Sequence, residues 1–234
     1  MEPIRAAVLP ADTPPPAGTQ LVVFADGKAY TPEALAQQLL ARAARYARRH
    51  RVWLVPQRFL AENRLCLCLL SPEGAVCGAQ TATHLNIDYR AYHFRRANAV
   101  APFDTPIGRV ALLVDVDIAM PHAVRQAARN GAELLLSSCF IQPFDLYEDR
   151  VRQTAMGAVQ ANGVPLVGSM SGYGMICQPG GEPLISAFED SPVAGEVTPV
   201  PADGSLRASM EEAQALLRAY GRLFTENGGE AEYV

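Results

Sequence analysis

The 234-residue sequence lacks the features that mark membrane, secreted and nucleic-acid-binding proteins. No apolar run approaches the roughly 20 residues that a membrane-spanning helix needs, and the N-terminus lacks a positive region followed by an apolar segment. The net charge is -4, so the basic excess typical of nucleic-acid-binding proteins is missing. We therefore expect a cytoplasmic protein whose partners include neither a membrane nor a nucleic acid.

The cysteines lack the spacing of a zinc site or a disulfide framework. There are five of them, an odd number, and no two have the C-x-x-C spacing. They are Cys66, Cys68, Cys77, Cys139 and Cys177. We expect free thiols in a reducing compartment, and neither a metal ion nor a cofactor.

Strand-like and helix-like patterns alternate along the chain, which is typical of an α/β protein. Hydrophobic residues make up 49% of the sequence, enough for the core of a single domain over residues 1–234. The first two apolar runs predict strands joined by a Pro-rich connector at 10–18, in which proline disfavours a helix. A helix is predicted next, with Thr31 as its N-cap and Pro32 in its first turn. An amphipathic C-terminal helix is predicted at 205–226.

Two further segments show the pattern of buried strands. Residues 52–60, VWLVPQRFL, predict one strand, and residues 108–136 predict a strand, a turn, a helix and a second strand. Asp115 stands at the end of the first apolar run of the latter segment. An unpaired carboxylate is unfavourable there, because an ionised group loses its hydration on burial. We therefore expect Asp115 to be solvated, paired, protonated or functional.

Several stretches together resemble the nitrilase, or carbon-nitrogen hydrolase, superfamily over residues 21–200. The resemblance rests on LCLCLLSPEGAVCGAQTATHLN, on FDTPIGRVALLVDVDIAMPHAVRQAARNGAELLL and on NGVPLVGSMSGYGMICQPGGEPL, in this order. It implies a four-layer α-β-β-α sandwich that commonly dimerises through helices on one face. It also implies chemistry at carbon-nitrogen bonds of nitriles and amides, in which a cysteine attacks, a glutamate is the general base and a lysine stabilises the developing charge.

The sequence departs from this family at each of the three catalytic positions. Asp115 stands at the position of the cysteine, Ala82 at that of the lysine and Asp26 at that of the glutamate. The resemblance implies that Asp26 and Asp115 meet in one pocket. They would then share a proton, hold a hard cation between them, or leave Asp115 as a buried acceptor of backbone hydrogen bonds.

Other positions that match the family are predicted to have structural roles. Asp117, two residues after Asp115, is expected to hold a turn, and His84 is expected to be a hydrogen-bonded structural histidine. His122 replaces a family glutamate at a helix start, where Arg125 is retained. Cys139, at the end of a predicted strand, is either a packed small residue or a relocated nucleophile.

These observations leave three functions open. The first is a member without the catalytic triad, a pseudoenzyme that binds a small molecule or a partner subunit. The second is an active hydrolase of amide or nitrile bonds, which uses Asp26 and Asp115 as an acid/base pair or Cys139 as its thiol. The third is an interaction subunit, which acts through its dimerising face and the helix at 209–224. We expect a homodimer, as the resemblance implies.

Overall fold

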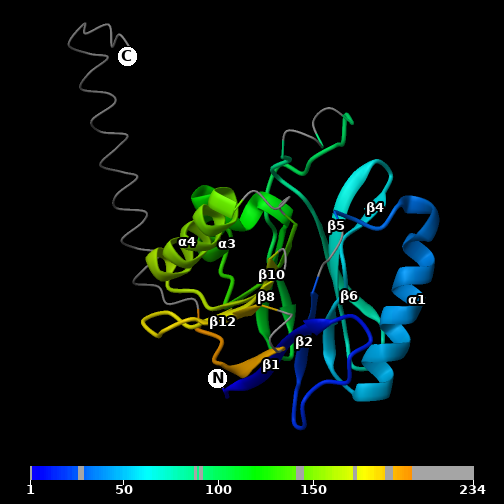
Figure 1. Ribbon diagram of the computed structural model, residues 1–234, viewed down its shortest axis with the longest axis horizontal. Coiled ribbons are helices and arrows are strands. Elements are labelled where there is room, and N and C mark those ends of the chain that lie inside the picture. Colours follow the sequence, from blue (N-terminus) through cyan, green and yellow to red (C-terminus); the bar gives the residue numbers. More distant parts are fainter. Residues whose placement is uncertain are drawn as a thin grey trace, which may run out of the picture. The chain divides into compact units, whose positions relative to one another are not determined.

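Two β-sheets packed face to face lie at the centre of the computed structural model (Figure 1). The structure describes residues 2–25, 29–86, 89, 92–140, 145–170, 173–187 and 192–201. Residues up to Pro201 form one compact unit. The C-terminal helix predicted at 205–226 lies outside the described residues, and the assignment of the whole chain to one domain stays a prediction.

The first sheet has the strand order β13-β1-β2-β3-β5-β4, with β6 paired to β5. Its strands are β1 (Ile4–Pro10), β2 (Leu21–Ala25), β3 (Trp53–Val55), β4 (Phe59–Ala61), β5 (Arg64–Leu70), β6 (Val76–Thr81) and β13 (Val193–Val197). β1, β2 and β3 are parallel, although residues 11–20, all of them described, connect β1 to β2 without a helix. The Pro-rich composition predicted that this connector holds no helix, because proline cannot donate the backbone hydrogen bonds of a helix.

The second sheet has the order β12-β11-β10-β9-β8-β7. Its strands are β7 (Phe103–Thr105), β8 (Gly108–Val114), β9 (Leu134–Cys139), β10 (Leu166–Met170), β11 (Tyr173–Cys177) and β12 (Leu184–Ala187). β8, β9 and β10 are parallel, so their carboxyl ends lie at one edge of the sheet. The residues that follow these strands are therefore brought together there.

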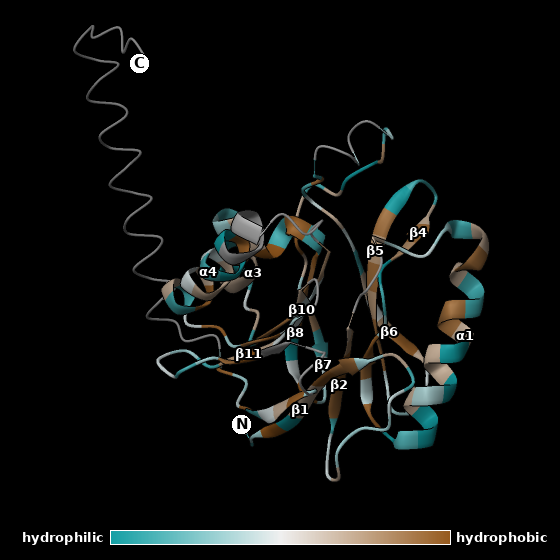
Figure 2. Cartoon of the chain, viewed as in Figure 1, coloured by the Kyte–Doolittle hydropathy of each residue, from teal (hydrophilic) through white to brown (hydrophobic). Residues whose placement is uncertain are grey.

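Helices cover the outer face of each sheet and complete four layers (Figure 1). α1 (Glu33–His50) packs on the first sheet, and α3 (Pro121–Arg129) and α4 (Asp145–Asn162) pack on the second. One hydrophobic core lies between the sheets and one under each helix layer, which agrees with the brown strands of Figure 2. The predicted α-β-β-α sandwich is confirmed. None of the helices in the described ranges combines the length and the apolar character that crossing a membrane requires.

The inner strands are buried on both faces, as is usual for parallel strands covered on both sides. In β9, Leu134 and Leu136 face the core between the sheets, whereas Leu135 and Cys139 face the core under α3 and α4. This alternation follows from the period of two residues in a strand. A side chain's position along β9 therefore decides which of the two cores it enters.

The start of α1 differs from the prediction. The helix begins at Glu33 with Pro32 in the N-cap position, and Thr31 is not its cap. The backbone of Thr31 is instead paired with the segment before β4, because its N–H donates to the Arg58 carbonyl at 2.8 Å and its carbonyl accepts from Leu60 at 2.9 Å. A residue whose backbone is held by a neighbouring strand in this way is fixed outside the helix.

The single strand predicted at 52–60 is also wrong. The chain forms β3, leaves the sheet at Pro56 and returns as β4. Proline lacks the N–H that a ladder needs, so it ends the first of these strands. The break holds Arg58, whose side chain is completely buried.

Candidate functional site

Asp115 forms an ion pair with Arg58 in the interior of the protein. Asp115 follows β8 and opens the short 3-10 helix η1 (Asp115–Ala119), with φ at 56° in the left-handed region. A short polar side chain tolerates this conformation better than most others. The Arg58 Nη1 donates to the Asp115 Oδ1, and both side chains are completely buried. The carboxylate that the sequence left unexplained therefore has a cation of the chain's own as its partner.

The remaining contacts of Asp115 are unevenly shared between its two oxygens. The Phe140 N–H, just beyond β9, donates to Oδ1 at 3.0 Å, whereas Oδ2 has no hydrogen-bond partner among the described residues. Burial raises the pKa of Asp115, and the Arg58 guanidinium and the backbone N–H groups of Phe140 and Val116 oppose that rise. We take the carboxylate as ionised, because the Arg58 guanidinium stays protonated in proteins and donates to its Oδ1.

The positions that match the family's glutamate and lysine, Asp26 and Ala82, add no described charge to the site around Asp115. Asp26 lies outside the described residues, so its convergence with Asp115 stays a prediction. Ala82 is completely buried in the core between the sheets. Its N–H donates to the Leu65 carbonyl at 2.9 Å, and its methyl group offers no charge to that core.

Tyr89 is a buried residue whose phenol interacts with the charges of Asp115 and Arg58, and the sequence patterns did not single it out. Burial raises the pKa of its phenol, and the Asp115 carboxylate raises it further. Its hydroxyl donates to the Ala29 carbonyl at 3.4 Å. Arg58 was missed as well, and the available signal was a charged residue between two apolar runs.

Asp117 lies on η1 and binds the chain just after β6. Its carboxylate accepts from the backbone N–H groups of Thr83 and His84 at 2.9 and 2.8 Å. It also accepts from the Thr83 hydroxyl at 2.6 Å and contacts the His84 Nδ1 at 2.9 Å. These contacts tie η1 to the 83–84 turn through a completely buried side chain.

His84 and His122 meet at the protein surface. Their Nε2 atoms are 2.7 Å apart, and their rings lie edge to face with centroids 4.5 Å apart. Because an ionised Asp117 only accepts hydrogen bonds, the Nδ1 of His84 carries a proton and its Nε2 is the acceptor in the neutral ring. The Nε2 of His122 then donates, which gives a chain from Asp117 through His84 to His122.

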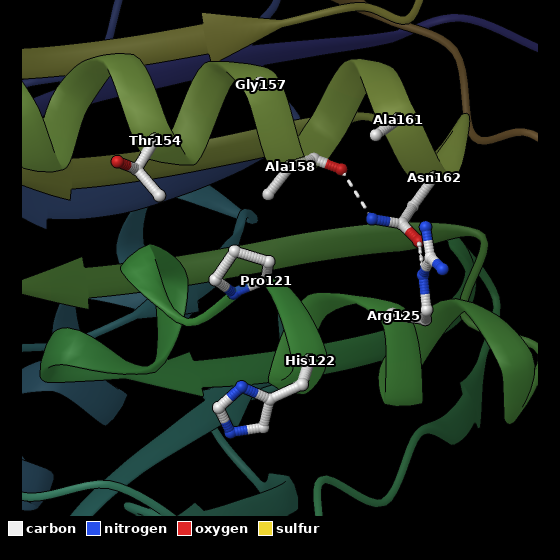
Figure 3. Close-up of a pocket in the computed structure, with 8 residues that line it drawn as sticks. All are labelled: Pro121, His122, Arg125, Thr154, Gly157, Ala158, Ala161 and Asn162. Atoms are coloured by element: carbon white, nitrogen blue, oxygen red, sulfur yellow. Dashed lines mark hydrogen bonds between the residues drawn. The ribbon is translucent and has the colours of Figure 1, made fainter. Parts of the chain in front are cut away.

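Arg125 and Cys139 occupy different surroundings from the ion pair. Arg125 is exposed on α3 and its Nε donates to the Asn162 side chain on α4 at 3.4 Å (Figure 3). Cys139 is completely buried and faces the core under the helices. Within the described ranges, no three side chains of the His, Cys, Asp or Glu types gather as metal ligands.

Cys77 is expected to react fastest with iodoacetamide in the folded protein, because it is exposed on β6. Burial raises the pKa of Cys68 and of Cys177 to about 12, and Cys139 is completely buried. Only a thiolate attacks, so these three thiols should react at least about 100-fold more slowly than Cys77 at pH 8. Peptide mapping of a time course measures this.

All five thiols of the unfolded chain should react at similar rates in the control reaction. Labelling of Cys139 as fast as that of Cys77 in the folded protein would contradict this expectation and favour the relocated thiol.

Comparisons with known proteins extend over most of the chain. The sequence model of one family, described as carbon-nitrogen hydrolase, matches residues 13–191. A carbon-nitrogen hydrolase from Helicobacter pylori G27 superposes with a TM-score of 0.73 at 16% identity, over 100% of both chains. None of the curated proteins compared with the chain matches it.

Two structures of an amidase from Nesterenkonia also superpose. A mutant of this nitrilase-superfamily enzyme has a TM-score of 0.70 at 18% identity, over 90% of this chain and 97% of that one. A second mutant, with the acetamide moiety of fluoroacetamide added covalently at its active-site cysteine, has a TM-score of 0.66 at 18% identity over the same shares. At these identities the structural likeness shows the fold alone.

Proposed function

We propose, from the premise that this chain belongs to the carbon-nitrogen hydrolase family, that it has lost the cysteine-dependent hydrolysis of that family and binds a small molecule or a partner subunit. The observation that carries the proposal is the buried ion pair of Asp115 with Arg58. The family resemblance assigns Asp115 to the position of the nucleophilic cysteine. In the Nesterenkonia amidase the active-site cysteine takes a covalent adduct.

The ion pair keeps two charges but not the reactivity of a thiolate and a lysine. A carboxylate is a weak nucleophile, and its attack on an amide would form an anhydride. A guanidinium stays protonated in proteins, so Arg58 cannot exchange a proton with a leaving amine. Ala82 supplies no cation for a tetrahedral oxyanion, and removal of one such donor commonly slows catalysis about 100-fold or more. Together these substitutions remove the nucleophile and the cation on which the family's mechanism depends.

The alternative is an active hydrolase that uses Asp26 and Asp115, or Cys139. The raised pKa of Asp115 is the observation in its favour, because a general acid must hold a proton near neutral pH. The contacts of Asp115 support this alternative less well, since one oxygen already accepts from Arg58 and from the Phe140 N–H. Cys139 is turned toward the core under the helices.

The purified protein is expected to show no turnover of amides, nitriles or N-carbamoyl compounds above the buffer rate, because Asp115 and Ala82 supply neither the thiolate nor the lysine of the family's mechanism. Ammonia release and product chromatography measure it. A variant with Arg58→Met and Asp115→Leu together is the matched control, since it removes both charges. Turnover by the natural chain that this variant loses would contradict the proposal and favour the acid/base alternative.

Binding and self-association are tested on the same material. We propose that the chain forms a homodimer, as the family resemblance implies, and light scattering after gel filtration measures its mass. Native mass spectrometry of freshly purified protein detects a bound small molecule. A monomer without a ligand would leave the binding proposal without support.

A further inference from the structure

A polar cavity of about 410 Å³ lies where the 83–84 turn, the 96–98 loop and α3 meet. Its polar lining residues are Thr83, His84, Arg96, Asn98, His122 and Gln126. No acidic side chain of the described residues lines it, although the chain as a whole carries a net charge of -4. Neither Asp115 nor Arg58 lines it, so it is distinct from the buried ion pair.

The carboxylate next to this cavity, that of Asp117, already accepts hydrogen bonds inside the protein. Asp117 is completely buried, and four contacts from Thr83 and His84 occupy its carboxylate. It orients His84 so that the Nε2 of that ring faces His122. The cavity therefore presents a guanidinium and two imidazoles without a carboxylate among them.

The histidine pair has room for one proton between its two Nε2 atoms. At 2.7 Å these atoms share a single hydrogen in the neutral state. A proton added at the Nε2 of His84 would turn both atoms into donors that face one another, and two N–H groups this close repel. His122 is exposed on the first turn of α3, so its ring can turn outward. Both N–H groups would then be free to donate to an anion.

We propose that this cavity binds a tetrahedral oxyanion, such as the phosphate group of a small ester, through Arg96, His84 and His122, with uptake of a proton by the histidine pair. A guanidinium and protonated imidazoles give charge-assisted hydrogen bonds to such a group. The cavity is larger than an inorganic oxyanion, which leaves space for the organic part of an ester. The site does not depend on whether hydrolysis has been lost.

Among the described residues, the charged groups around the pair are Asp117 on η1, Arg96 on the loop and Arg125 on α3. Arg125 lines the neighbouring cavity between α3 and α4, where its guanidinium contacts Asn162, and the ring of His122 is turned away from α4 (Figure 3). Protonation of the pair thus adds positive charge next to Arg96. Asp117 contacts His84 on the Nδ1 side of the ring, so an anion in the cavity would compensate the charge on the Nε2 side.

Sulfate is the probe that tests this site, because it stays a dianion where phosphate itself titrates. Imidazole NMR in metal-free buffer, with chloride keeping the ionic strength constant, measures sulfate affinity at about pH 5.5 and about pH 8. We expect affinity at least about ten-fold higher at the lower pH, because each proton taken up on binding changes affinity by up to ten-fold per pH unit. Acetate at the same ionic strength should bind at least about five-fold more weakly, because it offers fewer acceptor oxygens.

Three variants separate the cavity from general charge effects. His122→Gln should remove the pH dependence, and Arg96→Gln should weaken sulfate binding about ten-fold at both pH values. His50→Gln, which removes an imidazole from α1 on the opposite helix layer, should behave like the natural chain. Sulfate binding that does not change with pH, that survives in both cavity variants, or that acetate matches would overturn the proposal. Undetectable binding at the lower pH would overturn it as well.

Discussion

Replacing Arg58 with methionine is expected to lower the free energy of unfolding by about 3–5 kcal/mol, because it leaves the buried Asp115 carboxylate without its cation. Methionine retains much of the apolar stem, so loss of charge dominates the effect. Urea unfolding followed by circular dichroism measures the change. It should appear as a lower midpoint with an unchanged slope.

The double variant Arg58→Met and Asp115→Leu should recover most of this loss. Removing both members of a buried pair also removes the desolvation that each ion suffered, so such replacements are often neutral or stabilising. The two single variants and the double variant form a cycle that isolates the coupling. Arg42→Met is the matched control, because Arg42 pairs with Asp12 at the surface, and its effect should stay below about 1 kcal/mol. A change of similar size for Arg42→Met and Arg58→Met would contradict the special role of the buried pair.

Replacing Asp117 with alanine is expected to destabilise the protein by about 3 kcal/mol or more, because it leaves two backbone N–H groups and a hydroxyl without their acceptor. Asp117→Asn should lie between alanine and the natural residue, since its carbonyl still accepts while its NH2 group opposes a donor. Thermal and urea unfolding measure both variants.

Asp104→Ala is the control for this series, because Asp104 is exposed and its contact with Arg109 is 3.5 Å long. Its effect should be small. An Asp117→Ala protein as stable as Asp104→Ala would contradict the proposed tie between η1 and the 83–84 turn. Imidazole NMR adds a second readout, because His84 should lose its fixed tautomer in the Asp117 variant.

The positions of most strands and helices could be predicted from local sequence patterns. The connector at 10–18 predicted two strands joined without an intervening helix, and the structure has this connection. That the two strands are parallel neighbours came from the structure. The run at 52–60 misled, because its apolar residues continue past Pro56 while the hydrogen-bond ladder does not. Thr31 misled in a similar way, since a good capping residue was recruited by the neighbouring β4 segment.

The sequence by itself determined the family scaffold and which residues stand at its catalytic positions, because these follow from motifs read along the chain. It also determined that Asp115 would need a partner, because a buried carboxylate without one is unfavourable. Only the tertiary structure decided that the partner is Arg58, which is 57 residues away, and that His84 meets His122 beside a cavity. The physical reason is that periodicity reports which face a side chain occupies, whereas ion pairs and shared protons depend on how distant segments pack.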